Sequence, residues 1–385
     1  MAIYKEQNKL NVPHLRFPEF QGEWCISTIG EQFNLYSGNT PSRLNKEHFE
    51  GNVNWITSGE LKEHYISDTK EKISEDAATA NNLKLLHPGT FVIAIYGLEA
   101  DGVRGTGSIT CKESTISQAC MAFTQKGDVK NEFLYSWYKK HGNIIGIKYA
   151  QGTKQQNLSY DILEKFHIAY PSQDEQDKLI KFISLLDERI ATQSKLIEKL
   201  ESLIKGIAQH CIRELINGWE YVRLSDICKI TTGKLDANAQ VENGQYPFFT
   251  CAEQPFNIDS YAFNTEALLI SGNGANLGYI NYYKGKFNAY QRTYVLNYFS
   301  VNIQYVKWAL KVLLPKRIAI EKSSSNTPYI VLSTLADLKI PLPNNSKQNH
   351  IANLMQSFER KLSNQLALND LYNKQKQYML RQMFI

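Results

Sequence analysis

Cysteine is scarce in this sequence, and long apolar runs are missing. The six cysteines among 385 residues form no C-x-x-C pair, and none stands near a histidine at zinc-finger spacing. This excludes the common structural zinc sites. No apolar run approaches the roughly 18–20 residues of a membrane span, and the first residues hold no apolar segment of the kind found in secretory signals. We therefore expect a cytoplasmic protein with reduced thiols.

The motifs of the common enzyme classes are also absent. The sequence has no G-x-x-x-x-G-K-[ST], no strand-anchored G-x-G-x-x-G, no H-E-x-x-H, no G-x-S-x-G and no N/D-P-P-Y/F motif of amino-methyltransferases. The glycine cluster nearest to such a motif, at 272–278, lacks an acidic residue near position 295 that would hold a ribose. We predict no catalytic residue, no metal and no cofactor in this chain, and favour a binding or scaffold function over an enzyme.

The chain contains an internal repeat. Residues 22–31 return at 217–226 with an offset of 195, which aligns Trp24 with Trp219 and Gly38 with Gly233. Residues 163–171 return at 335–343 with an offset of 172. The smaller second offset means that the first globular part is the longer one. A length of 385 residues fits two or three domains.

Each globular part is followed by a long segment with helical periodicity. The first opens with Ser172-Gln173-Asp174-Glu175, the pattern of a capping box, and has no proline from 172 to 218. Apolar residues then alternate at spacings of four and three, which is a heptad seam. About 44 residues would give a rod of roughly 66 Å. The seam positions of both segments are Leu179, Ile183, Leu186, Ile190, Gln193, Ile197, Leu200, Ile351, Met355, Phe358, Leu362 and Gln365.

Two interpretations of these helices stay open. Each could be the core helix of its own domain, or the two could pair with each other as an antiparallel coiled coil. We favour pairing, because a long helix with a narrow seam needs a partner of similar length. Gln193 and Gln365 fall opposite each other in the repeat, and polar residues in a seam often fix its register.

The globular parts are predicted to be mixed α and β. Strands are expected at 52–57, 91–95 and 116–123 of the first part and at 247–250, 267–271, 278–283 and 293–299 of the second. Short helices are expected at 129–140 and 301–314. The fold class is therefore α+β, with boundaries at 1–171 for the first part, 172–217 for the first long helix, 218–343 for the second part and 344–385 for the second helix.

One stretch of the second part is free of acidic residues. The 54 positions between Glu266 and Glu321 hold seven lysines and arginines, interleaved with aromatic residues, in a chain of net charge +5. Such a stretch favours an anionic partner, since basic groups attract phosphates and Asn, Gln, Arg and Lys side chains can read base edges. The first part has comparable residues near a polar loop at 151–157. The candidate DNA-binding residues are Arg43, Arg104, Lys154, Gln155, Asn273, Lys284, Lys286, Tyr290, Gln291, Arg292 and Lys322.

A structural role competes with each of these assignments. Most of the aromatic residues are expected in the core, and the lysines could simply form a solvated face. Arg292 could pair with a carboxylate of its own domain instead of reaching DNA. We place Arg292 at the start of a strand and Lys284 and Lys286 in a turn around Gly285, where lysines more often contact phosphate.

Four motifs of the first part are characteristic: Val12-Pro13-His14-Leu15-Arg16-Phe17-Pro18, Gly38-Asn39-Thr40-Pro41-Ser42, Gly51-Asn52-Val53-Asn54-Trp55-Ile56-Thr57-Ser58-Gly59-Glu60-Leu61 and Leu86-His87-Pro88-Gly89-Thr90. With these motifs, nearly the whole chain resembles the specificity subunit of type I restriction-modification systems. The second part has the variant form Thr232-Gly233-Lys234-Leu235-Asp236. Pro171 with Glu175-Gln176 matches the family's P-x-x-x-E-Q helix start, whereas the second copy has Lys347 in place of the glutamate.

The resemblance implies two target recognition domains, each reading one half of a bipartite double-stranded DNA site. It also implies that the long helices separate these domains and dock two methyltransferase subunits, with restriction subunits joining through the complex. S-adenosylmethionine and ATP would then bind to the partners. The alternatives are a fused methyltransferase-nuclease, for which the methyltransferase motif is missing, and a DNA-independent coiled-coil scaffold for protein partners.

Overall fold

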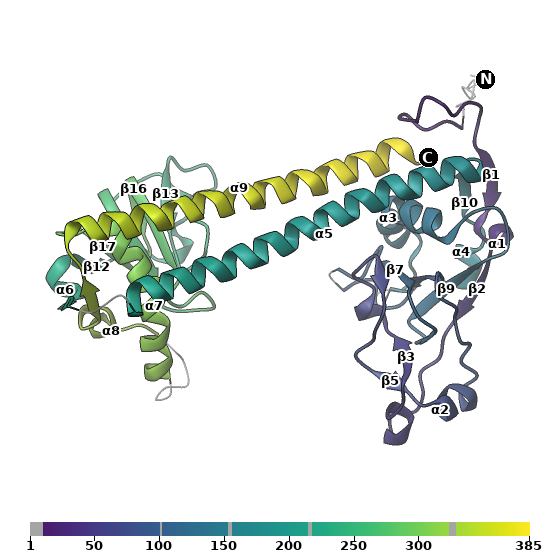
Figure 1. Cartoon of the computed structure of the whole chain (residues 1–385), viewed down its shortest axis with the longest axis horizontal. Helices are drawn as coiled ribbons and strands as arrows, with labels where there is room; N and C mark the ends of the chain where they lie inside the picture. Colours follow the sequence, from purple (N-terminus) through teal and green to yellow (C-terminus); the bar gives the residue numbers. More distant parts are fainter. Residues whose placement is uncertain (1–10, 101, 153–155, 215–217, 323–328) are drawn as a thin grey trace. The chain divides into compact units, whose positions relative to one another are not determined.

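The computed structural model describes residues 11–100, 102–152, 156–214, 218–322 and 329–385. Their backbone falls into two compact units (Figure 1). The first unit comprises the chain up to Thr192 together with Asn369–Ile385, and the second unit is Gln193–Leu368. Each unit therefore contains one globular part and a section of both long helices.

Each globular part is closed at its base by two short antiparallel strands. In the first unit β1 (Cys25–Thr28) pairs with β10 (His167–Tyr170), and in the second β11 (Glu220–Arg223) pairs with β18 (Lys339–Leu342). Cys25 faces Tyr170 as Glu220 faces Leu342, so the two registers agree with the sequence offsets of 195 and 172. The repeat seen in the sequence therefore marks the two strands that enclose each globular part.

The first globular part holds two sheets. One has the order β2-β9-β6-β7-β4 and the other the order β5-β3-β8. The strand expected at 116–123 is wrong as one element, because a turn at 117–119 divides it between the two sheets. The strands are β2 (Phe33–Ser37), β3 (Val53–Ile56), β4 (Tyr65–Ile66), β5 (Lys72–Ile73), β6 (Phe91–Ala94), β7 (Gly107–Thr110), β8 (Ser114–Ile116) and β9 (Cys120–Gln125).

The second globular part has a single six-stranded sheet of order β12-β17-β15-β16-β13-β14. The strands are β12 (Lys229–Thr232), β13 (Tyr246–Phe249), β14 (Phe256–Ile258), β15 (Phe263–Ser271), β16 (Ile280–Ala289) and β17 (Thr293–Asn297). The turn predicted around Gly285 is wrong, because β16 runs through it with Gly285 opposite Thr265. Gly285 has a φ of +141°, a value that other residues rarely adopt.

Helices cover these sheets and connect the units. α3 (Asn131–Tyr149) packs on β6, β7 and β9, and α7 (Ile303–Lys322) packs on β15, β16 and β18. Both helices are longer than predicted. α3 continues to Tyr149, and α7 continues past Pro315. The short helices are α1 (Ile29–Gln32), α2 (Glu75–Ala80), α4 (Tyr160–Leu163), α6 (Leu224–Ile227) and α8 (Leu332–Ala336).

The two long helices are α5 (Gln173–Gln209) and α9 (Asn345–Met383). α5 is shorter than the predicted 44 residues, because a π-helical turn at His210–Glu214 follows it; its 37 residues span about 55 Å. Among the described residues the mixed α/β fold with two repeated units and two long helices is as predicted.

Both interpretations of the long helices hold inside each unit. In the first unit Leu179 and Ile183 of α5 join Leu380 and Met383 of α9 in the globular core. In the same unit Asp187 pairs with Lys376, and Arg189 lies 4.7 Å from the ring of Tyr372. Positions that rise along α5 thus meet positions that fall along α9, which is antiparallel pairing (Figure 1).

The second unit repeats this arrangement. Leu200 and Ile204 share its core with Ile351 and Met355. Gln193 Nε2 donates to Gln365 Oε1 at 2.8 Å and to Gln365 O at 3.1 Å. Among the seam positions, the buried ones are Leu179, Ile183, Gln193, Ile197, Leu200, Ile351 and Met355, and the partly buried ones are Leu186, Ile190, Phe358, Leu362 and Gln365.

The start of α5 differs from the predicted capping box. Ser172 Oγ accepts from Glu175 N at 3.4 Å, but the Glu175 carboxylate does not reach back. It accepts instead from Arg16 at 2.8 and 2.6 Å and from Trp24 Nε1 at 3.3 Å. In the second copy, where Lys347 replaces the glutamate, Asn344 Oδ1 caps α9 by accepting from Lys347 N at 3.0 Å.

Candidate nucleic-acid interface

Three loops of the second unit converge at one edge of its sheet. They follow β13, β15 and β16, and backbone bonds hold them together: Gly272 N donates to Arg292 O at 2.9 Å, and Tyr290 N donates to Phe249 O at 2.9 Å. Cys251 lies among them, with Sγ 3.0 Å from Asn273 Oδ1. The structure therefore brings together four of the predicted residues, Asn273, Tyr290, Gln291 and Arg292.

Of these four residues, Gln291 and Arg292 are exposed, and Asn273 and Tyr290 are partly buried. Among the residues that the structure describes, no carboxylate forms an ion pair with Arg292, so the competing intradomain pair is not found. Arg292 precedes β17 rather than starting it. A fork of guanidinium donors beside an exposed amide has the chemistry for reading guanine or adenine edges.

Lys284 and Lys286 lie apart from this cluster, on the middle of β16. With Tyr282 they alternate outward on one face of the strand. Lys284 Nζ is 3.7 Å from Glu266 Oε2, and Lys286 Nζ is 4.7 Å from the ring centre of Tyr261. The side chain of Lys322, at the end of α7, lies outside the described residues. Four aromatic residues of the acid-free stretch are core residues: Phe287, Tyr294, Tyr305 and Trp308.

The candidates of the first unit are more dispersed. Arg43 pairs with Glu71 at 2.5 and 2.8 Å, and its guanidinium lies 4.7 Å from the ring of Phe49. Arg104 Nη2 donates to Gln156 Oε1 at 2.8 Å, which ties it to the polar loop. No described contact joins Arg43 to Arg104. Lys154 and Gln155 lie outside the described residues.

A hollow beside this loop contains residues that the sequence did not single out. It has a volume of about 500 Å³ and is lined by Tyr96, Asn157 and Tyr160, among others. Its polar rim comes from Ser37, Gln151 and Ser159. Asn157 closes the loop by exchanging backbone hydrogen bonds with Gln151 at 2.8 and 2.9 Å. In the sequence, only the polar composition of the loop at 151–157 indicated this hollow as a candidate site.

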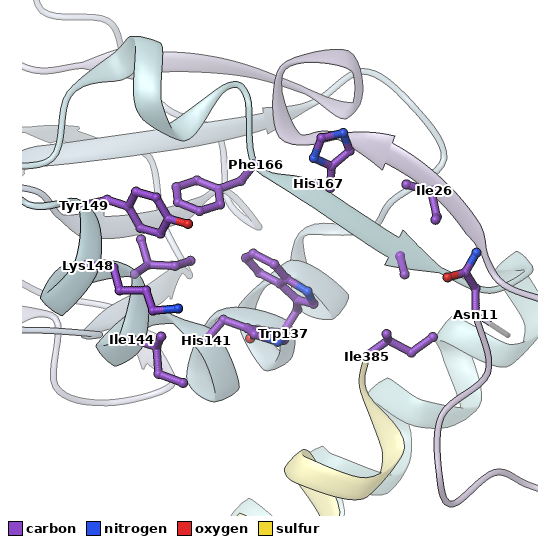
Figure 2. Close-up of a pocket in the computed structure, with 12 residues that line it drawn as sticks. Asn11, Ile26, Trp137, His141, Ile144, Lys148, Tyr149, Phe166, His167 and Ile385 are labelled. Carbon is purple, nitrogen blue, oxygen red and sulfur yellow. The ribbon is translucent and has the colours of Figure 1, made fainter. Parts of the chain in front are cut away.

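A second cavity in the first unit has a different character. It measures about 370 Å³ and lies between α3, β1 and the end of α9 (Figure 2). Trp137, Ile144, Phe166 and Ile385 make it largely apolar. Burial lowers the pKa of His141 to about 4, so this ring is neutral near pH 7. Lys148 and His167 also line this cavity, so its wall is apolar with a lysine beside it.

Two other kinds of site are absent from the described residues. No group of three or more His, Cys, Asp or Glu side chains in that part of the chain could hold a metal ion. No helix within the same residues is long and apolar enough to cross a membrane.

Residues 21–202 and 216–369 match a family described as the type I restriction modification DNA specificity domain. The chain belongs to this family. It is thus a DNA specificity subunit rather than a catalytic one, and neither the fused enzyme nor the DNA-independent scaffold is supported.

Individual relatives agree with this assignment. The EcoDI specificity subunit of Escherichia coli is 45% identical over 134 residues, which cover 35% of this chain and 30% of that protein. The MjaIX specificity subunit of Methanocaldococcus jannaschii is 24% identical over 387 residues, which cover 89% of this chain and 88% of that protein. The crystal structure of an S subunit from M. genitalium shares the fold with a TM-score of 0.64, at 19% identity over 97% of this chain and 99% of that one.

Proposed function

We propose that this specificity subunit reads a bipartite, asymmetric double-stranded DNA sequence, one half through each globular part. The observation that carries the proposal is the loop cluster of the second unit, where Gln291 and Arg292 are exposed and Asn273 lies beside them. Arg292 has no ion-pair partner among the described residues, so its guanidinium is available to a base or a phosphate.

The asymmetry follows from how the two units differ. They share the base strands but build a pair of sheets in one case and a six-stranded sheet in the other. Their candidate residues also differ, since the second unit presents a convergent cluster and the first a polar loop beside a hollow. Different side chains on different scaffolds read different base edges. Two unlike half-sites are therefore expected.

Two methyltransferase subunits are the proposed protein partners, with restriction subunits joining through the complex. Exposed leucines on the outer face of the long helices support docking there. These are Leu196, Leu203 and Leu366 in the second unit and Leu185 and Leu371 in the first. Apolar side chains outside the seam fit a protein partner better than water. S-adenosylmethionine and ATP would bind to those partners, in the cytoplasm.

The test is to map methylated bases in a host that gains this chain with its methyltransferase. The expected result is one new motif with two specified halves around an unspecified spacer. Binding of that duplex by the purified complex should weaken steeply with salt. The proposal is wrong if the chain changes no methylation pattern and the complex binds scrambled DNA equally well.

A further inference from the structure

In each unit, a carboxylate at the same position of the repeat projects from a long helix toward the globular part. In the first unit it is Asp187 of α5, and in the second it is Glu359 of α9. These positions are related by the repeat offset of 172, as are Lys139 and Lys311 on α3 and α7. The same place in each unit thus carries an acidic group, although its partners differ.

In the first unit Asp187 meets a lysine and a histidine from different elements. Its Oδ1 accepts from Lys376 Nζ of α9, and its Oδ2 lies 3.5 Å from His64 Nδ1. The other ring nitrogen of His64 lies 2.8 Å from Glu132 Oε2 of α3. The imidazole stacks between Tyr65 and Tyr135, with ring centres 4.1 and 4.0 Å away. His64 directly precedes β4, so this cluster joins the five-stranded sheet to α3, α5 and α9.

These groups are shielded enough to interact strongly. The side chains of His64, Asp187 and Lys376 are 13%, 22% and 14% exposed. Burial alone would lower the pKa of His64, but hydrogen bonds and charges from Asp187 and Glu132 outweigh it and raise this pKa. Burial likewise opposes ionisation of Asp187, yet His64 and Lys376 hold its pKa below the usual value.

In the second unit both cations come from α7. Lys307 Nζ lies 2.7 Å from Glu359 Oε2, and Lys311 Nζ lies 3.0 Å from Oε1. Lys307 occupies the position of Tyr135 in the repeat. Burial works against the charge on Glu359, but the two lysines lower its pKa. Because α7 packs on β15 and β16, this pair ties the six-stranded sheet to α9.

We propose that Asp187 and Glu359 are positioning residues that fix the orientation of each DNA-reading sheet on its long helix. This inference rests on the proposed function. No described contact joins either carboxylate to a candidate DNA-binding residue, so their effect on recognition passes through the sheet. Apolar core contacts permit small rotations, whereas charge-assisted hydrogen bonds demand one geometry. A half-site can be read only if its sheet keeps a set angle to the helix.

The direct test of positioning needs no DNA. Ile109 N donates to His64 O at 2.8 Å and Cys111 N to Ile66 O at 2.9 Å, so both amides report on β4. In the free full-length chain, Asp187→Asn should speed hydrogen exchange at these two amides by about ten-fold, since the negative charge that His64 faces is lost. Asp177→Asn is the matched control, because Asp177 also forms an ion pair from α5, with Lys130, but its side chain is 60% exposed. Equal exchange in the two variants would overturn the proposal.

The recognition test uses the complex with the methyltransferase subunits. Its probes are the duplex with the mapped motif and two duplexes with one half scrambled. Asp187→Asn should reduce discrimination at one half, and Glu359→Gln at the other, each by roughly ten-fold. If exchange at β4 rises but neither half loses discrimination, the positioning role is wrong. If the unaltered complex prefers none of the duplexes, the proposed function fails, while the exchange result still stands.

A pH profile separates positioning from general stabilisation. His64 faces Glu132 of α3, Asp187 of α5 and the rings of Tyr65 and Tyr135. The charged groups around these partners are Lys376 of α9, Lys139 of α3 and Glu63. Because the pKa of His64 is raised, its charge pairing is present below about pH 6.5 and is lost as pH rises through the raised value.

Discrimination at the first unit's half-site should therefore decline on the alkaline side. His64→Lys replaces the histidine with a lysine, the residue type that pairs with Glu359 in the second unit. This variant should flatten the decline, because a lysine stays charged at a pH where histidine has lost its proton. Any slope that remains belongs to Lys139, whose pKa is lowered to about 8 by burial and by Lys376. An identical profile for His64→Lys and the natural chain would contradict the role of His64.

Discussion

A charge placed in the helix seam of the second unit should disrupt that unit. Leu200 is 6% exposed and packs in one cluster with Ile204, Ile351 and Met355. Truncating a buried leucine to alanine costs about 2–5 kcal/mol, and an unpaired buried carboxylate adds several kcal/mol. Leu200→Asp should therefore remove at least 3–4 kcal/mol, on the order of half of a typical domain stability. Ile197→Asp is expected to act in the same direction.

The loss can be read from urea denaturation followed by hydrogen exchange of peptides from the second unit. With a denaturant slope of about 2 kcal/mol per molar urea, a loss of 3 kcal/mol lowers the midpoint by roughly 1.5 M. In the assembled complex, specific DNA binding and methyltransferase docking should be lost together.

Leu203→Asp is the matched control, because Leu203 lies on the same helix but is 52% exposed. It should leave the urea midpoint of the free chain within about 0.5 M. If Leu200→Asp and Leu203→Asp shift the midpoint equally, the seam does not hold the helices together and the reasoning fails.

Three further predictions concern recognition and register. Methylation mapping should give two different half-sites, and a perfect inverted repeat would contradict the asymmetry of the units. Arg292→Ala should cost about 1–3 kcal/mol and relax one half-site only, whereas Lys286→Ala should weaken binding evenly and reduce the salt slope by about one; equal losses on all duplexes for Arg292→Ala would remove it from base reading. Gln193→Leu should destabilise the second unit by about 1–3 kcal/mol, because it leaves the side-chain amide of Gln365 without its hydrogen-bond partner. Adding Gln365→Leu in a double variant should restore much of this loss. Thermal unfolding of the two single variants and the double variant measures the losses, and additive losses would argue against the pairing.

The repeat was the most informative feature of the sequence. Its offsets of 195 and 172 match the registers of β1 with β10 and of β11 with β18. The heptad spacing located the helix faces that enter the cores, because burial of a periodic face is a local property of a helix. The glutamine of the helix start has a role that periodicity could not show. Gln176 accepts from Lys130 N at 3.0 Å, and Gln348 accepts from Asn302 N at 3.1 Å.

Other errors arose where distant residues override local preference. Glu175 fits a capping box by spacing, but Arg16 and Trp24 compete for its carboxylate. Gly285 resembles a turn residue, yet the long pairing of β16 with β15 carries it through as strand. The loop cluster around Cys251 joins segments that lie 22 and 41 residues away from it, and no pattern in the chain revealed that they would meet.

The base strands also bear on how specificity can change. Thr28 faces His167 and Arg223 faces Lys339, so each recognition segment leaves and re-enters at adjacent backbone positions. The first segment is longer by the 23 residues that separate the offsets of 195 and 172, and its sheets are built differently. The same two-stranded ladder thus encloses two segments of different length and different sheet structure. A different segment would fit the same ladder only if its ends match that spacing and its inner side also supplies partners for Asp187 or Glu359 on the long helices.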